Sequence, residues 1–278
     1  MFWQELTSDA FPAAVQAAGG VCVLPLGVME RHAHHLPLGT DMLIAHELCR
    51  RAAELEPVIV FPDFYFTKIA EARCFPGAVS VEAELTYRLL ENTCQEIARN
   101  GLKKIVIVSG HGGNYFLTRY LAQTQLASRR DYAVYVVDPA VPPQEEAELN
   151  ALFAQGFSDH AGEGETSQVL AFRPDLVHME QVPQEPEGAP RGRLKDLSEA
   201  NIFTAIWWYA DYPTHYAGDA RPAAAEKGER LLEAMARNLA ANLRAVKQDE
   251  ITARLLDEFY DAAERPVKGD ALNVMGED

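Results

Sequence analysis

The chain has 278 residues, of which 48% are hydrophobic and 24% are charged, so it can bury a sizeable core and is not a largely disordered protein. Its formal charge of −16 at pH 7 opposes binding to phosphate backbones and anionic membranes, so we expect no nucleic-acid or membrane partner. A neutral or cationic small molecule is the ligand that fits this charge best. The four cysteines form no CxxC pair and the N-terminus does not resemble a signal peptide, so we predict reduced thiols and a cytoplasmic location.

Strand and helix patterns alternate through the first half of the chain, which is typical of parallel βα units. We predict strands at 21–26, 58–61, 105–108 and 132–137. The helices predicted between them are at 42–55, 82–100 and 115–129. Thr40 or Asp41 would cap the first of these helices, and Gly101 would end the second. We therefore expect a three-layer α/β/α fold with a mostly parallel central sheet of at least four strands.

The second half of the chain continues the same domain. Residues 181–200, rich in proline, glycine and charge, predict an exposed excursion rather than a linker, because structured sequence resumes soon afterwards. A long amphipathic helix is predicted at 223–248, followed by a C-terminal tail at 249–278. Residues 1–278 are therefore expected to form a single domain.

The densest group of possible ligands follows the first predicted strand, in the segment E-R-H-A-H-H-L-P-L-G-T-D. Glu30 and His32 are two residues apart, so their side chains point to one side if the chain is extended there, and Asp41 enters from the next helix. Two carboxylates and an imidazole suit Zn²⁺, Mn²⁺ or Fe²⁺. His34 and His35 are expected to pack beside such a site, and a simple helix cap is the alternative role for Asp41.

A second cluster, S-G-H-G-G-N, follows the strand predicted at 105–108 and precedes a helix. Its glycines allow a sharp turn that leaves His111 unobstructed. Neither a GxxxxGK[ST] nor a GxGxxG spacing is present, which argues against phosphate binding. We interpret His111 as a turn histidine at the carboxyl end of a strand, where ligands of open α/β sheets collect.

A third cluster, D-H-A-G-E-G-E-T-S, begins a predicted helix that runs to about Phe172. It contains His160, Glu163 and Glu165, and taken alone it is explained by capping chemistry at a helix start. Three such clusters at strand ends and helix starts of one α/β chain favour a site for one or two divalent metal ions.

The three segments, in this order, resemble the signature motifs of the creatininase family of amidohydrolases, and the resemblance covers most of residues 21–232. It implies that Glu30, Asp41 and His111 hold one divalent metal ion. It further implies that His32 and the bridging carboxylate of Asp41 hold a second ion. A homo-oligomer, such as a hexamer, is the assembly that the family resemblance suggests.

The resemblance also implies that His160 transfers a proton, with Glu163 as the reserve candidate for that role. Creatininase proper has a glutamate at the position of Gly113, and we expect Glu165 to supply the missing carboxylate. It also has a tryptophan at the position of Gly156, so a creatinine-specific pocket is not expected. An aromatic concentration downstream could instead line a pocket or a subunit interface; it comprises Trp207, Trp208, Tyr209, Tyr212, His215 and Tyr216.

These residues predict a metal-dependent hydrolase in which activated water attacks the carbonyl of a small linear or cyclic amide. Hydrolytic C–C cleavage of an oxidised cyclitol or keto-sugar is the alternative reaction, because the same polarised carbonyl would serve it. A non-catalytic metal-binding protein is the third reading. It would gain support if metal bound with no open coordination position.

Overall fold

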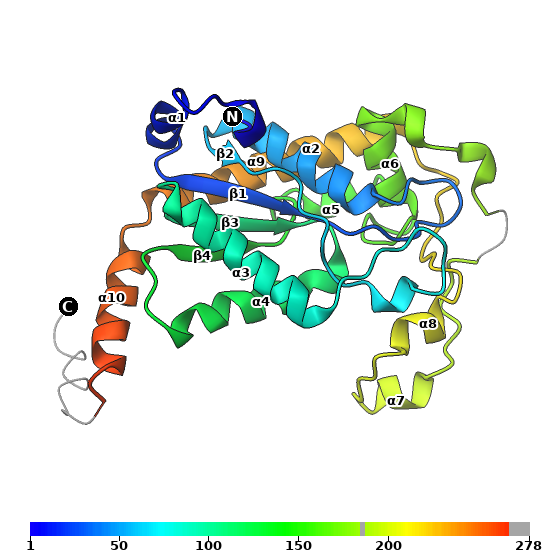
Figure 1. Cartoon of the computed structure of the whole chain (residues 1–278). Helices are drawn as coiled ribbons and strands as arrows, with labels where there is room; N and C mark the ends of the chain where they lie inside the picture. Colours follow the sequence, from blue (N-terminus) through cyan, green and yellow to red (C-terminus); the bar gives the residue numbers. More distant parts are fainter. Residues whose placement is uncertain (184–186, 267–278) are drawn as a thin grey trace.

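The computed structural model describes residues 1–183 and 187–266, in which helices cover both faces of a central sheet (Figure 1). The sheet is parallel throughout, with strand order β2-β1-β3-β4; its strands are β1 (Val21–Leu26), β2 (Ile59–Val60), β3 (Lys104–Ser109) and β4 (Ala133–Val137). The predicted three-layer α/β/α fold with a parallel central sheet is confirmed.

Ten α-helices lie within the described residues. They are α1 (Phe11–Ala17), α2 (Thr40–Leu55), α3 (Ala83–Arg99), α4 (Tyr115–Thr124), α5 (Glu146–Asn150), α6 (Glu163–Phe172), α7 (Lys195–Glu199), α8 (Trp207–Asp211), α9 (Ala225–Gln248) and α10 (Ile251–Ala263). Short 3-10 helices occur in the connections, among them η3 (Gly112–Asn114) and η4 (Gln125–Ala127). Within these residues no helix is long and apolar enough to cross a membrane.

The alternation of side chains along β1 explains the layers. Val21 and Val23 point to one face of the sheet and pack in a core cluster with residues of α2 and α9. Cys22 and Leu24 point to the other face, where they pack with residues of α3, and Leu24 also joins a residue of α4. All six residues of β1 are buried, as expected for a central parallel strand covered on both sides.

Strand register determines where the segments that carry Glu30 and His111 leave the sheet. β1 and β3 are neighbours, and Leu26 at the end of β1 lies opposite Ser109 at the end of β3. The segments that follow both strands therefore leave the sheet at the same edge. α2 begins directly against this edge: a Cβ on Gly110 would lie 2.2 Å from the backbone oxygen of Asp41, so only glycine fits there.

Some local predictions need correction. The cap prediction for α2 is wrong, because its N-cap is Gly39 and no side chain makes a capping hydrogen bond. The hydroxyl of Thr40 donates instead to the carbonyl of Pro37, and Asp41 lies in the first turn with its carboxylate at the sheet edge. The helix predicted at 115–129 is shorter, since α4 gives way to the tighter turn of η4.

Two predicted segments extend beyond the described residues. Of the tail at 249–278, residues 251–263 form α10, and residues 267–278 lie outside the described part of the chain. Of the excursion at 181–200, residues 184–186 likewise lie outside it. Its described residues include α7, which with α8 stands away from the sheet (Figure 1).

Candidate metal centre

Glu30 and His111 meet where β1 and β3 end. Glu30 comes four residues after β1 and His111 two residues after β3. Oε1 of Glu30 lies 2.8 Å from Nδ1 of His111, and both side chains are buried. The structure thus brings together two residues that are some eighty positions apart in sequence.

Asp41 lies between two histidines and presents a different oxygen to each. Its Oδ2 is 3.0 Å from Nδ1 of His111, and its Oδ1 is 3.0 Å from Nε2 of His32. A carboxylate in this arrangement can bridge two cations.

Several buried polar atoms at this point have no hydrogen-bond partner among the described residues. They include Oε1 of Glu30 and Oδ2 of Asp41, which both face Nδ1 of His111. Unpaired buried polar atoms are costly in a folded protein, so their convergence points to a missing ligand. Glu30, Asp41 and His111 can each offer one ligand atom, and these atoms lie within 4.8 Å of one another.

The orientation of His32 also fits a cation. Its Nδ1 lies 3.3 Å from the carbonyl oxygen of Glu30, which only accepts, so Nδ1 carries the proton. In a neutral ring Nε2 then presents a lone pair to the carboxylates of Asp41 and Glu165, at 3.0 and 3.6 Å. A histidine whose second nitrogen donates to a backbone carbonyl is the usual arrangement of a metal ligand.

Glu165 and Glu163 occupy the first turn of α6 but point to different places. Oε2 of Glu165 lies near His32 and accepts a 2.6 Å hydrogen bond from the backbone N–H of Ala161. Glu163 instead accepts from the backbone N–H of Ala154 at 2.7 Å and pairs with Lys227. Glu165 is thus beside the cluster, whereas both oxygens of Glu163 are occupied elsewhere.

His160 packs beside the ring of His32, and its Nε2 points to a backbone carbonyl rather than to a carboxylate. Its ring centroid is 4.3 Å from that of His32, and its Nε2 donates to the backbone carbonyl of Arg31 at 3.0 Å. His34 and His35 are outside the cluster, as expected: His34 contacts Arg31, and His35 is hydrogen-bonded to Thr166.

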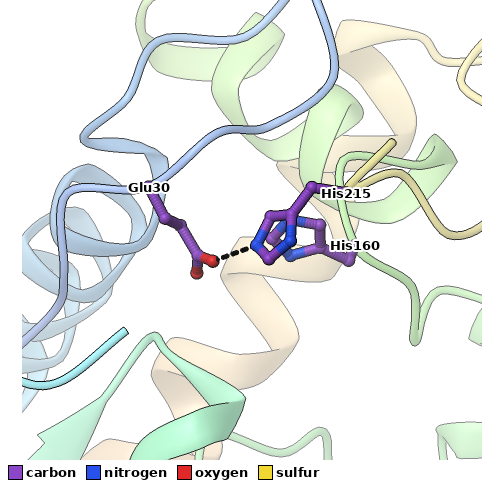
Figure 2. A group of neighbouring side chains, drawn as sticks. All are labelled: Glu30, His160 and His215. Carbon is purple, nitrogen blue, oxygen red and sulfur yellow. Dashed lines mark hydrogen bonds and ion pairs between the residues drawn. The ribbon is translucent and has the colours of Figure 1, made fainter. Parts of the chain in front are cut away.

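His215 belongs to the site, although the motifs did not single it out as a metal-site residue. Its Nε2 lies 2.6 Å from Oε2 of Glu30, and the ring of His160 makes an edge-to-face contact with its ring (Figure 2). On the far side, the indole N–H of Trp208 donates to Nδ1 of His215 at 2.9 Å. The only sequence signal was its place within the aromatic concentration that follows Trp207.

The protonation states show how strongly the cluster attracts positive charge. Burial alone would lower the pKa of His32, but the carboxylates of Asp41 and Glu165 raise it to about 10. His111 behaves in the same way: against the effect of burial, Glu30 and Asp41 raise its pKa to about 10. Protons thus take the place that divalent cations would fill, and metal binding would release them.

Backbone conformation around the cluster is strained. Of the four non-glycine residues with positive φ in the described chain, three adjoin the site: Ala33 at φ 51°, Ala161 at φ 57° and His215 at φ 58°. Such conformations persist where the surrounding structure enforces them, and they concentrate at functional sites.

A cavity of about 410 Å³ opens onto the cluster. Glu30, Asp41, His111, His160 and Glu165 line its polar end, and the aromatic walls comprise Phe116, Phe203, Trp207 and Trp208. Trp207 and Trp208 thus fall in the wall of a pocket, one of the two roles expected for the aromatic concentration.

A larger hollow of about 720 Å³ adjoins this cavity and shares several lining residues with it, including Gly113, Phe116 and Phe203. Its remaining walls are mostly apolar. The candidate metal centre therefore lies beside a mostly apolar hollow.

Comparison with known proteins agrees with this architecture. The sequence model of the family described as creatinine amidohydrolase (creatininase) matches residues 4–243. Creatinine amidohydrolase of Pseudomonas putida is 27% identical over 88% of this chain and 96% of its own length. A mycofactocin precursor peptide peptidase of Mycobacterium ulcerans is 28% identical over 77% of this chain and 80% of its own length. A 3-dehydro-scyllo-inosose hydrolase of Thermotoga maritima is 24% identical over 77% of this chain and 73% of its own length.

Solved structures show the same fold. A creatininase crystal structure has a TM-score of 0.74 and 26% identity, covering 89% of this chain and 98% of its own. A di-zinc form of a creatininase mutant has a TM-score of 0.73 and 27% identity, and the match covers 89% of this chain and 98% of its own. A manganese form has a TM-score of 0.72 and 27% identity, and the match covers 89% of this chain and 99% of its own.

The fold and the clustered carboxylates and histidines define a metal-dependent amide hydrolase. The chain belongs to the creatininase family.

Proposed function

We propose that the protein uses divalent metal to hydrolyse the C–N bond of a small linear or cyclic amide. The observation that carries this proposal is the placement of Asp41, with one oxygen facing His111 and Glu30 and the other facing His32. Glu30, Asp41 and His111 would hold one ion. His32, Asp41 and Glu165 would hold the second.

The residues around the centre have separate tasks in this reaction. Bound Zn²⁺, Mn²⁺ or Fe²⁺ supplies a Lewis acid that lowers the pKa of water and polarises the substrate carbonyl. His160 lines the same cavity, and its Nε2–H donates to the carbonyl of Arg31. Within the described residues no hydrogen bond occupies its Nδ1, which would accept a proton and pass it to the leaving nitrogen. Glu163 is the second candidate for proton transfer, but its ion pair with Lys227 argues for a structural role instead.

The cavity also bears on the substrate. Its polar end is small, and the adjoining hollow offers apolar walls formed by Phe116, Phe203 and Trp207. We therefore include amides that carry an apolar substituent, such as N-substituted formamides and short peptides. The mycobacterial relative named as a peptide peptidase supports this range.

Hydrolytic C–C cleavage of an oxidised cyclitol is the second candidate reaction. It is favoured by the relative from Thermotoga maritima, which is named as a hydrolase of such a compound. Polarised carbonyl and activated water serve both reactions, so the substrate pocket decides between them.

The test begins with elemental analysis of the purified protein, followed by reconstitution with Zn²⁺, Mn²⁺ or Fe²⁺. The loaded protein is then assayed on formamides, small lactams, short peptides and oxidised cyclitols. Amide turnover that vanishes on chelation supports the main proposal, and turnover of the cyclitol alone supports the alternative. Stoichiometric metal without any turnover would instead support a non-catalytic metal-binding protein.

We also propose a cytoplasmic homo-oligomer, with a hexamer as the expected size. Two strongly exposed aromatic side chains, Phe116 and Phe203, with 75% and 74% of their surfaces accessible, are suited to a subunit contact. Light scattering coupled to size-exclusion chromatography measures the assembly directly. A monomer at micromolar concentration would contradict this part of the proposal.

A further inference from the structure

A hydrogen-bonded chain runs from Trp208 through His215 to Glu30. The indole N–H of Trp208 donates to Nδ1 of His215 at 2.9 Å, and Nε2 of His215 lies 2.6 Å from Oε2 of Glu30. His215 and Glu30 are almost fully buried, so the contact between them is shielded from bulk solvent, whereas Trp208 is half-buried. Figure 2 shows the second of these contacts.

The chemistry of the three groups fixes the direction of both hydrogen bonds. An indole N–H only donates, so Nδ1 of His215 must present its lone pair. A neutral imidazole carries one proton, which is therefore on Nε2, where it is donated to the carboxylate of Glu30. Trp208 and the carboxylate of Glu30 thus favour the same tautomer, in which His215 is a donor toward Glu30.

This tautomer excludes a role for His215 as a metal ligand. Glu30, His160 and His215 also lie close enough together to resemble a metal site. However, Nε2 cannot bind a cation while it holds its proton, and Nδ1 faces the indole. His215 must therefore act on Glu30 rather than on the ion.

Glu30 uses its two oxygens differently as a result. Oε2 accepts from His215, whereas Oε1 faces His111 without a hydrogen bond of its own. The donor at Oε2 leaves Oε1 as the oxygen available to a metal, and it fixes the rotation of the carboxylate.

The backbone supports this reading. His215 has a φ of 58°, in the left-handed region that side chains other than glycine rarely adopt. Ring contacts hold it from two further sides, with centroids 4.8 Å from His160 and 5.7 Å from Phe75. The chain thus accepts an unfavourable conformation in order to direct this imidazole toward Glu30.

We propose that Trp208 and His215 are positioning residues that hold Glu30 as a ligand through one oxygen, and that the indole N–H reinforces the tautomer on which this depends. The proposal rests on the function proposed above, in which Glu30 binds metal. Loss of a hydrogen-bonded partner of a metal ligand typically weakens metal binding by about 10 to 100-fold.

The test uses Trp208→Phe, which removes the indole N–H and keeps an aromatic ring. Zn²⁺ affinity is measured by competition with a chromogenic chelator, and we expect it to fall, but by less than the roughly 10 to 100-fold typical for loss of a direct partner of a ligand. Trp207→Phe is the matched control, because no hydrogen bond from its indole is present within the described residues; its Zn²⁺ affinity should match the wild type. Long-range ¹H–¹⁵N spectra of metal-free protein should show the Nε2–H tautomer of His215 in the wild type and a weaker preference for it in Trp208→Phe.

A second pair of variants replaces the imidazole itself. His215→Gln keeps a donor for Glu30 and an acceptor for Trp208, so it should retain Zn²⁺ affinity better than His215→Leu. Equal Zn²⁺ affinity in wild type, Trp208→Phe and His215→Leu would overturn the proposal. So would an unprotonated Nε2 together with the loss of one bound ion in His215→Leu, since His215 would then be a ligand. Failure of the proposed function gives a different result: wild type that binds metal but hydrolyses no amide.

Discussion

Gly113 offers a sharp test of whether His111 binds metal in the orientation described. A Cβ at this position would lie 2.3 Å from Nε2 of His111, whereas ordinary van der Waals contact begins at 3.4 Å. In Gly113→Ala the two atoms must therefore separate by about 1.1 Å, the difference between those distances. Gly113 does not have a positive φ, so the backbone accepts alanine and the collision alone is tested.

The collision should move the imidazole rather than unfold the protein. Nε2 is at the far end of a ring that can rotate, but rotation displaces Nδ1 from Glu30 and Asp41. Metal–ligand distances tolerate deviations of only about 0.2 Å. A displacement of about 1 Å at the ring thus costs a ligand, and we expect metal affinity to fall by at least about 10-fold, or about 1.4 kcal/mol.

Gly112→Ala is the matched control, because it lies in the same short helix, η3, and a Cβ there meets no atom within 4 Å. Both variants and the wild type are titrated with Zn²⁺ against a chelator, and their metal-free melting temperatures are compared. We expect Gly112→Ala to match the wild type in both measurements. Wild-type affinity in Gly113→Ala would refute the reasoning, since His111 would not be a ligand in this orientation.

Other predictions address the remaining residues of the centre. Asp41→Asn should lose bound metal while keeping a native circular dichroism spectrum; full metal content would show that Asp41 is not a ligand. Glu165→Gln should bind one ion instead of two by elemental analysis, whereas Glu163→Gln should lower the melting temperature through loss of the Lys227 pair without changing the stoichiometry. Chelation should lower the wild-type melting temperature, because ligands of the native state stabilise it; an unchanged value would argue against a bound metal. Creatinine opening should have a kcat/KM below about 10⁴ M⁻¹s⁻¹, the lower end of the ordinary enzyme range, and steady-state kinetics at or above that value would contradict the expectation.

The fold could be predicted from the sequence because the apolar runs of β1 and β3 are short and bounded by turn residues, and helical patterns separate them. Gly101 correctly marked the end of α3, where it has a φ of 92°. The cap of α2 could not be predicted from residue preference alone. Asp41 has the chemistry of a capping residue, but the histidines that engage it come from the segment before α2 and from the end of β3.

Part of the candidate centre could also be predicted from the sequence. Parallel strands place their carboxyl ends at one edge, so Glu30 and His111 could be expected to converge. Glu163 and Glu165 are harder to separate, although two residues on a helix are rotated by about 200° and cannot share a direction. Which of them faces His32 depends on how α6 packs. His215 could not be assigned a role, because its contact with Glu30 is created by the fold of the segment after α8 rather than by any motif.

The two departures from creatininase proper carry different weight once the structure is considered. The tryptophan missing at Gly156 suggested that a planar substrate would lack a stacking surface, yet Trp207 and Trp208 line the cavity and can supply one. That argument against creatinine is therefore weakened. Gly113 is the stronger departure, because a glutamate there would collide with His111 as it is placed here. A site with that glutamate must orient its histidine differently, so we expect the ligand arrangement proposed for this chain to differ from one that includes a glutamate there. The cavity also adjoins an apolar hollow that Gly113 itself lines. The expected preference for amides other than creatinine thus rests on the metal centre and the shape of its entrance, not on the lack of an aromatic wall.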